Sequence, residues 1–225
     1  MAVSDVQICN IALSRAACQQ FINSLDDPTA EARVCKMVYL FTLERVLQDF
    51  PWAFARTYAE LQDIGIPVKP WAYRYRYPGD CLQAHRVIPG DGVIVGGQSF
   101  AGALYNGALA NGQSSYYLSK TAGIPYQVIG DVDSDSKAIL CDFPGAVIEY
   151  TARITKVGLF PPAFANILAW AITAEIVTPL SQDLKYAQAA NQSYQRALAE
   201  AGALAFGEGQ DDVLPDGELL NSRDY

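Results

Sequence analysis

Hydrophobic residues recur with a helical period at both ends of the chain and with a period of two in the middle. Ser4-x-x-Gln7 matches a capping box, in which a hydroxyl and an amide satisfy exposed N–H groups at a helix start. Asp27-Pro28 then places an acid at an N-cap and a proline at the first helical position. A second helix is therefore predicted from there to Pro51. The residues predicted to face a core are Val6, Cys9, Leu13 and Ala16 in the first helix and Val34, Met37, Val38, Phe41 and Leu47 in the second.

The helical period returns at Pro161-Pro162, where apolar residues surround a predicted helix almost completely and Glu175 is its only charge. A helix that is apolar on all sides is buried, so this one is predicted to be central to a bundle and to end at Pro179. Ser181 is predicted to cap a fourth helix, which carries an alanine-rich stripe and ends at Gly207. A stripe of small residues allows a neighbour to approach closely, and its candidate interface residues are Ala190 and Ala197.

The middle of the chain has the period of a β-structure. Its clearest stretch alternates aromatic with basic side chains: Tyr73, Arg74, Tyr75, Arg76 and Tyr77. Further strands are predicted at residues 81–88, 93–95, 126–129, 138–141 and 147–154. Residues 88–125 are rich in Gly and Ala, and a stretch of this length inside a compact domain predicts a projecting arm.

Together these patterns predict an α+β protein. Its fold would be an antiparallel helical bundle built from both chain ends, with an inserted antiparallel β domain. The predicted parts are residues 1–55 with helices one and two, 56–155 with the β domain and its arm at about 88–125, 156–206 with helices three and four, and 207–225 as a flexible tail. The tail holds six acids and one arginine, a composition typical of disorder.

Composition narrows the class of protein. Of the 225 residues 51% are hydrophobic, which excludes global disorder, and the net charge of −8 argues against tight binding of nucleic acid. No apolar run approaches the ~20 residues that cross a bilayer, and the first residues lack the pattern of a signal peptide. The five cysteines are odd in number and form no C-x-x-C pair. We therefore expect reduced thiols, in a protein made in a cytoplasm.

Two motifs resemble catalytic or metal sites, and neither is complete. Gly-x-Ser-x-Ala around Ser99 resembles a nucleophile elbow, but the single histidine, His85, precedes the serine instead of following it. Asp131, Asp133 and Asp135 resemble the opening of a calcium loop, yet the glycine and the bidentate glutamate of that loop are missing, so a solvated hairpin tip is favoured. The glycine-rich segment matches no nucleotide motif. The sequence therefore predicts no catalytic residue, no cofactor and no metal, and a protein that is not an enzyme.

Arg74 and Arg76 are expected on one strand face, near His85 and Arg86 in sequence. One interpretation is a solvated face with ion pairs inside the same subunit, each contributing only ~0–1 kcal/mol. The other is contact with an acidic neighbour, for which the tail of another copy, with Asp211, Asp212 and Tyr225, is a candidate. The sequence favours neither.

Several segments, in order, resemble one known family. They are residues 4–15 (SDVQICNIALSR), 24–33 (SLDDPTAEAR), 50–55 (FPWAFA), 71–75 (WAYRY), 77–82 (YPGDCL), 150–155 (YTARIT), 159–160 (LF) and the helix around Trp170 that reaches residues 178–180 (TPL). In their sequences and in their order, these segments are similar to the tail tubular protein A family, the head-to-tail adaptors of short-tailed, podovirus-type bacteriophages. The match covers most of the helical segments and both ends of the β insertion. Residues 88–125 depart from it, because they are longer and richer in Gly and Ala.

The resemblance implies a structural virion protein without catalytic residues. It implies a homo-oligomeric ring, typically a dodecamer of 12 copies, that docks below the portal protein and above a tail nozzle similar to tail tubular protein B. Genomic DNA would pass through the lumen without specific binding, the location would be the head-to-tail interface of the virion, and no membrane would be involved. Two alternatives remain: a carbohydrate- or receptor-binding tail module, which would suit the tyrosine-rich strands, and a serine hydrolase that uses Ser99.

Overall fold

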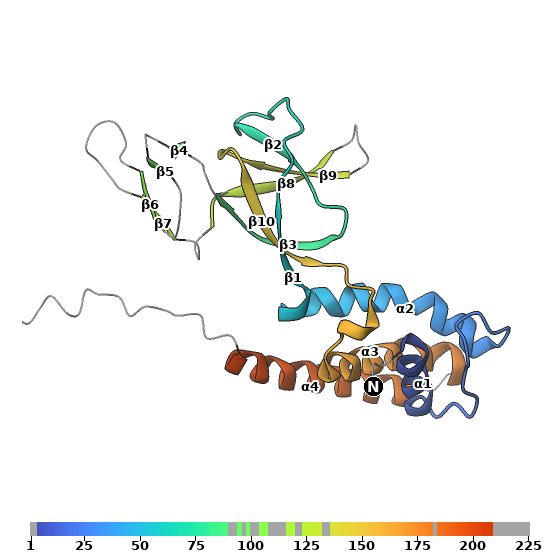
Figure 1. The fold of residues 1–225 in the computed structure, drawn as a ribbon. Coiled ribbons are helices and arrows are strands. Elements are labelled where there is room, and N and C mark those ends of the chain that lie inside the picture. Colours follow the sequence, from blue (N-terminus) through green and yellow to red (C-terminus); the bar gives the residue numbers. More distant parts are fainter. Residues whose placement is uncertain are drawn as a thin grey trace, which may run out of the picture. The chain divides into compact units, whose positions relative to one another are not determined.

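A computed structural model describes residues 4–89, 94–95, 98–99, 104–107, 116–119, 123–131, 136–181 and 184–208. Over these positions the chain is a mixed α+β protein with four α-helices and two small three-stranded antiparallel sheets (Figure 1). It divides into two compact units. Residues 4–39 and 161–208 form the helical unit, and residues 40–160 form the sheet unit.

Helix α1 (Asp5–Arg15) begins at the capping box that the sequence predicts. The Gln7 backbone N–H donates to Ser4 Oγ at 3.1 Å, and the Ser4 N–H donates to Gln7 Oε1 at 3.0 Å. The predicted core face is confirmed at Cys9, Leu13 and Ala16, which are buried with Ile8 and Ala12.

Helix α2 (Ala30–Asp49) starts later than predicted. Thr29 acts as its cap, because Thr29 Oγ1 accepts from the Ala32 N–H at 3.2 Å, whereas Asp27 Oδ2 accepts from the Asn23 N–H at 2.8 Å and stabilises the preceding turn. The end before Pro51 is confirmed.

The predicted core face of α2 is wrong in part. Met37 is 71% exposed and Phe41 is 67% exposed, while Leu47 is buried as predicted. The buried positions instead include Ala32, Cys35, Leu43 and Val46. Apolar residues occur on more than one side of this helix, so two stripes at helical spacing compete, and the observed one buries the smaller residues near the helix start.

Helix α3 (Pro162–Ser181) is the most buried helix that the structure describes, and it contacts both α1 and α4. Thr173 Oγ1 donates to the Ala169 carbonyl at 2.7 Å and lies 3.4 Å from the Ala12 carbonyl oxygen of α1. Ten of its residues are buried: Phe164, Ala165, Ile167, Leu168, Ala169, Ala171, Ile172, Thr173, Ile176 and Val177.

Pro179 does not end α3, which corrects the prediction. The proline lies in the last turn, where its missing N–H removes only one hydrogen bond, and the helix continues to Ser181. Ser181 is therefore not an N-cap, and its hydroxyl donates to the Val177 carbonyl at 2.9 Å.

By length and composition α3 could cross a membrane, which corrects the expectation that no apolar stretch approaches that length. The correction follows from Pro179 lying within the helix, so that the apolar stretch reaches 20 residues. Within α3, 56% of the 18-residue apolar window is buried inside the structure. The core helix of a folded domain shows burial of this kind.

Helix α4 (Leu184–Glu208) includes Gly207, so the predicted end at that residue is wrong. Its buried residues include Ala190, Tyr194 and Ala201. This apolar face lies against α3.

The sheet unit contains two three-stranded antiparallel sheets. In the first, β10 (Ala146–Ala152) lies between β1 (Arg56–Glu60) and β3 (Cys81–Pro89). In the second, β9 (Ser136–Cys141) lies between β2 (Tyr73–Arg76) and β8 (Tyr126–Asp131). The predicted strands at 81–88, 126–129, 138–141 and 147–154 are confirmed within a few residues.

Two short strand pairs lie in the region predicted as an arm. They are β4 (Ile94–Val95) with β5 (Gln98–Ser99), and β6 (Leu104–Gly107) with β7 (Tyr116–Ser119). The 3-10 helices η1 (Ala53–Ala55) and η2 (Val157–Leu159) flank the sheets in sequence.

One apolar core joins the two sheets, because the same cluster of buried side chains draws on both. Tyr75 of β2 lies in it with Ile139 of β9 and Ile148 of β10. The Tyr75 hydroxyl donates to the Phe143 carbonyl at 2.7 Å, and burial raises the pKa of Tyr75 to about 12. The sheets therefore form a single packed body despite having no strand in common.

Candidate functional site

Strand β2 separates aromatic from basic side chains as its sequence predicts. Tyr75 is buried in the apolar core, and Arg74 and Arg76 lie on the opposite face of the same strand. Arg74 pairs with Leu140 and Arg76 with Ala138 in the β2–β9 register. The alternation therefore places both guanidinium groups on one side of the second sheet.

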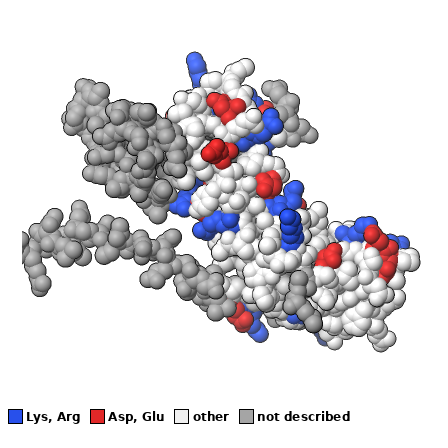
Figure 2. All heavy atoms as spheres, viewed as in Figure 1, with Lys and Arg blue, Asp and Glu red and all other residues white. Residues whose placement is uncertain are grey.

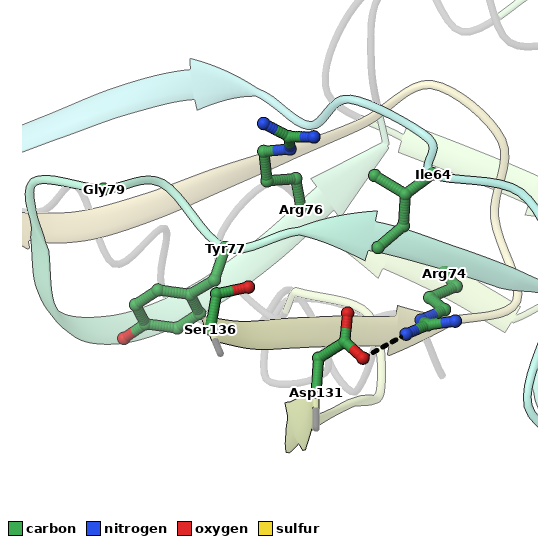
Figure 3. A pocket seen from close by; sticks show the side chains of 7 residues that line it. All are labelled: Ile64, Arg74, Arg76, Tyr77, Gly79, Asp131 and Ser136. Atoms are coloured by element: carbon green, nitrogen blue, oxygen red, sulfur yellow. Dashed lines mark ion pairs between the residues drawn. The ribbon is translucent and has the colours of Figure 1, made fainter. Parts of the chain in front are cut away.

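These two arginines line a hollow of about 520 Å³ (Figure 3). Arg74 Nη2 forms an ion pair with Asp131 Oδ1 at 2.5 Å, and the two side chains are only 17% and 6% exposed. Figure 3 shows Asp131 turned toward Arg74, while the Arg76 guanidinium stands apart from that pair. The remaining lining residues are Ile64, Tyr77, Gly79 and Ser136.

The hollow has more donors than the described residues satisfy. Arg74 Nε is buried and has no hydrogen-bond partner in the described part of the chain. Over the same residues the Arg76 guanidinium forms no ion pair. A buried donor without an acceptor costs about 1–3 kcal/mol. Because the hollow presents two cations and one anion, its chemistry suits an anionic acceptor.

A second ionic cluster lies on the first sheet and was not singled out by the sequence. Glu149 of β10 is 2% exposed. Its carboxylate pairs with Arg56 Nε at 3.2 Å and with Arg86 Nε on the neighbouring strand. The signal in the sequence is a single acid, Glu149, inside the apolar run of β10. A carboxylate can be buried at such a position when cations neutralise its charge. Both arginines contact the Glu149 carboxylate, so we interpret this cluster as a structural element of the first sheet.

His85 lies beside this cluster on β3. Its Nε2 and Thr151 Oγ1 are 2.7 Å apart. Burial and then the nearby Arg56 lower the pKa of His85. The side chain of Ser99 lies outside the described residues, so the geometry of a serine site is not defined.

The calcium-like segment joins two strands, which agrees with its predicted hairpin position. Strands β8 and β9 pair antiparallel on either side of residues 132–135, which lie outside the described residues. Asp131 itself is paired with Arg74. Over the described positions, no group of three or more His, Cys, Asp or Glu side chains could hold a metal ion.

The other predicted interface residues are distributed unevenly. Ala190 is 3% exposed and lies in the helical core, while Ala197 is partly exposed on α4. Asp211, Asp212 and Tyr225 lie outside the described residues. A bulky substitution at Ala190 would disrupt the helical core. Ala197 is therefore the better of the two alanines for testing an interface.

Acidic and basic side chains lie close to one another on the viewed face of the molecule (Figure 2). A nucleic-acid-binding surface usually carries a continuous basic stripe. The mixed charges that line the hollow and the net charge of −8 indicate local ionic contacts instead.

Comparison with protein-family models finds no match. Comparison with curated proteins finds no significant match either.

Proposed function

We propose that this protein is a phage head-to-tail adaptor, a structural virion protein that forms a ring between the portal and the tail nozzle. The observation that carries the proposal is the ordered series of segments that resembles the tail tubular protein A family, from residues 4–15 to residues 178–180. We propose no catalytic role, and a location in the virion at the head-to-tail interface.

The grouping of distant segments supports this proposal. Residues from before position 40 and after position 160 fall in one compact unit, and α3 contacts both α1 and α4. We interpret these helices as an antiparallel bundle built from both chain ends, into which the sheet unit is inserted. A ring subunit needs such a rigid body, together with further elements that reach its neighbours.

Charge also supports the proposal. The chain carries 24 acidic and 16 basic residues. Negative walls repel phosphate groups, so DNA can pass a ring of such subunits without being held by counterion release. Binding to DNA is not required for this role, and specific binding would hinder it.

The test is assembly on a portal. We expect the purified full chain, mixed with the portal ring encoded in the same genome, to form a stacked complex with portal-matched copy number. Negative-stain electron microscopy and native mass measurement would show the complex. A chain that does not associate with the portal at any ratio would contradict the proposal.

Two substitutions on α4 provide a matched pair for this assay. Ala197→Trp adds bulk at the partly exposed candidate interface position, and Ala189→Trp adds the same bulk at an exposed position on the same helix. We expect the first to lower ring assembly at least about tenfold, the factor that corresponds to ~1.4 kcal/mol, and the second to leave it unchanged. Equal assembly by both variants would exclude the surface at Ala197 as the interface.

A further inference from the structure

We propose that the hollow at Arg74 and Arg76 binds acidic side chains from residues 209–224 of a second copy of this chain. The site is the concave surface on β2, β8 and β9 described above, and its ligand class is a carboxylate-bearing peptide. The inference rests on the proposed assembly in one respect only, because assembly brings the second copy near.

The donors of the hollow define the ligand chemistry. Arg74 Nε is buried without an acceptor in the described part of the chain, and Arg76 lines the same hollow without an ion pair there. A guanidinium presents its N–H groups in a planar fork that matches a carboxylate. Asp131 already neutralises part of Arg74, so the unmatched charge in the lining is that of one arginine.

The shape of the hollow suits a peptide with mixed side chains. Its volume of about 520 Å³ exceeds what one carboxylate needs. Ile64 supplies an aliphatic wall, Tyr77 an aromatic one, and Ser136 a hydroxyl (Figure 3). A ligand with an aliphatic residue next to an acid would therefore use more of the surface than a free anion would.

Residues 209–224 have this composition. They hold five acids and one arginine, and place acids beside aliphatic residues twice, as Asp211-Asp212-Val213-Leu214 and as Glu218-Leu219-Leu220. The complementarity of a carboxylate-rich segment to a hollow with unmatched donors selects this occupant. A nucleic acid is disfavoured more strongly than this segment, because it carries a negative charge at every nucleotide and the chain as a whole carries −8.

The primary test measures peptide binding to the full chain. In the receptor, the five acids of residues 209–224 are replaced by their amides (Asp211→Asn, Asp212→Asn, Asp216→Asn, Glu218→Gln and Asp224→Asn), so that its own segment does not compete. The probe is a fluorescein-labelled peptide of residues 209–225, and binding is followed by anisotropy at low salt. We expect saturable binding that weakens as salt rises, since screening reduces exposed ionic contacts.

Arg76→Gln in this receptor is the critical variant, because Arg76 is exposed and its change leaves the buried Arg74–Asp131 pair intact. We expect peptide affinity to fall by about fivefold, the upper end of the range for one exposed ionic contact. Arg33→Gln removes an exposed arginine from α2 in the helical unit and should leave affinity within about twofold. Equal affinities for the two variants, or equal binding of a peptide with amidated acids, would overturn the proposal. So would preferential binding of a single-stranded oligonucleotide.

A second measurement tests the source of the peptide. We expect wild-type chains to self-associate in sedimentation experiments more strongly than Arg76→Gln chains. Equal association would overturn the assignment to a second copy. Portal docking is measured separately. If the peptide fails to bind while docking is intact, only the proposed peptide site in the hollow is rejected. If the peptide binds while docking fails, only the adaptor role is rejected.

Discussion

The helical unit and the sheet unit are stabilised by different interactions. In the described part of the helical unit, the buried residues are apolar except for Thr173, which satisfies its hydroxyl within α3. In the sheet unit, the carboxylates of Asp131 and Glu149 are buried and pair with arginines from other strands of the same sheet.

Because of this difference, the two units should tolerate different kinds of amino-acid substitution. Apolar packing is not directional, so volume-conserving substitutions usually cost less than about 1.5 kcal/mol. A buried ion pair requires its specific partner, and removing one member leaves an uncompensated charge. We therefore expect the stability of the helical unit to depend on the volume of its buried side chains. The stability of the sheet unit should depend on the chemical identity of its buried side chains. The following substitutions test this expectation from the largest effect to the smallest.

Phe164→Ala should cost the most. Phe164 of α3 is fully buried in the helical unit. Truncation to alanine removes its packing and leaves a cavity, so we expect the free energy of unfolding to fall by about 3–5 kcal/mol. Urea unfolding followed by far-UV circular dichroism would measure it. Phe164→Leu keeps most of the volume, and an equally large loss for that variant would contradict dependence on volume.

Glu149→Gln tests the sheet unit. The substitution preserves shape but removes the charge that Arg56 and Arg86 share. Because both arginine side chains keep contact with solvent, at 42% and 30% exposed, we expect a loss of about 2 kcal/mol, below the ~3–5 kcal/mol for fully buried pairs. The same urea experiment applies. A loss no greater than that of Glu175→Gln, an acid on α3 in the helical unit, would argue against dependence on chemical identity.

Ser4→Ala measures a local contribution at the start of α1. The Ser4 hydroxyl accepts from the Gln7 N–H, and loss of an N-cap side chain costs about 1 kcal/mol. Thermal unfolding should show a correspondingly small decrease in Tm. Ser14→Ala removes a hydroxyl that donates to the Ile11 carbonyl within the same helix, and a larger effect there would contradict the importance of the cap.

The smallest effect concerns pH. Burial and then Arg56 lower the pKa of His85 in the folded chain, so the unfolded chain binds this proton more readily. The contribution of His85 to stability is therefore complete above its ordinary pKa of about 6.5 and is lost as pH falls below it. We expect the unfolding free energy to decrease from pH 7.5 to pH 5.5, and to decrease less in His85→Gln. Identical pH profiles would rule out this role.

Sequence patterns predicted the elements better than the faces that they bury. The capping box at Ser4, the tyrosine–arginine alternation on β2 and the positions of β3, β8, β9 and β10 were predictable, because each is a local signal. The burial of Met37 and Phe41 in α2 was predicted wrongly, since a helix with apolar residues on several sides does not specify its buried side locally.

The candidate site divides in the same way. The common face of Arg74 and Arg76 follows from strand periodicity alone. The Arg74–Asp131 pair joins β2 to the end of β8, and the Glu149 cluster joins three strands. Such partners depend on strand order, which separate local patterns do not encode.

The pairing of β1 with β10 has a consequence for how this chain could change over evolution. Arg56 and Thr151 are register partners, so the chain enters and leaves the intervening segment at adjacent points, about 5 Å apart between their Cα atoms. A gap of that size can be closed by a tight two-residue turn. The segment between these residues is thus a cassette, which recombination can shorten, lengthen or replace while its two points of attachment stay fixed.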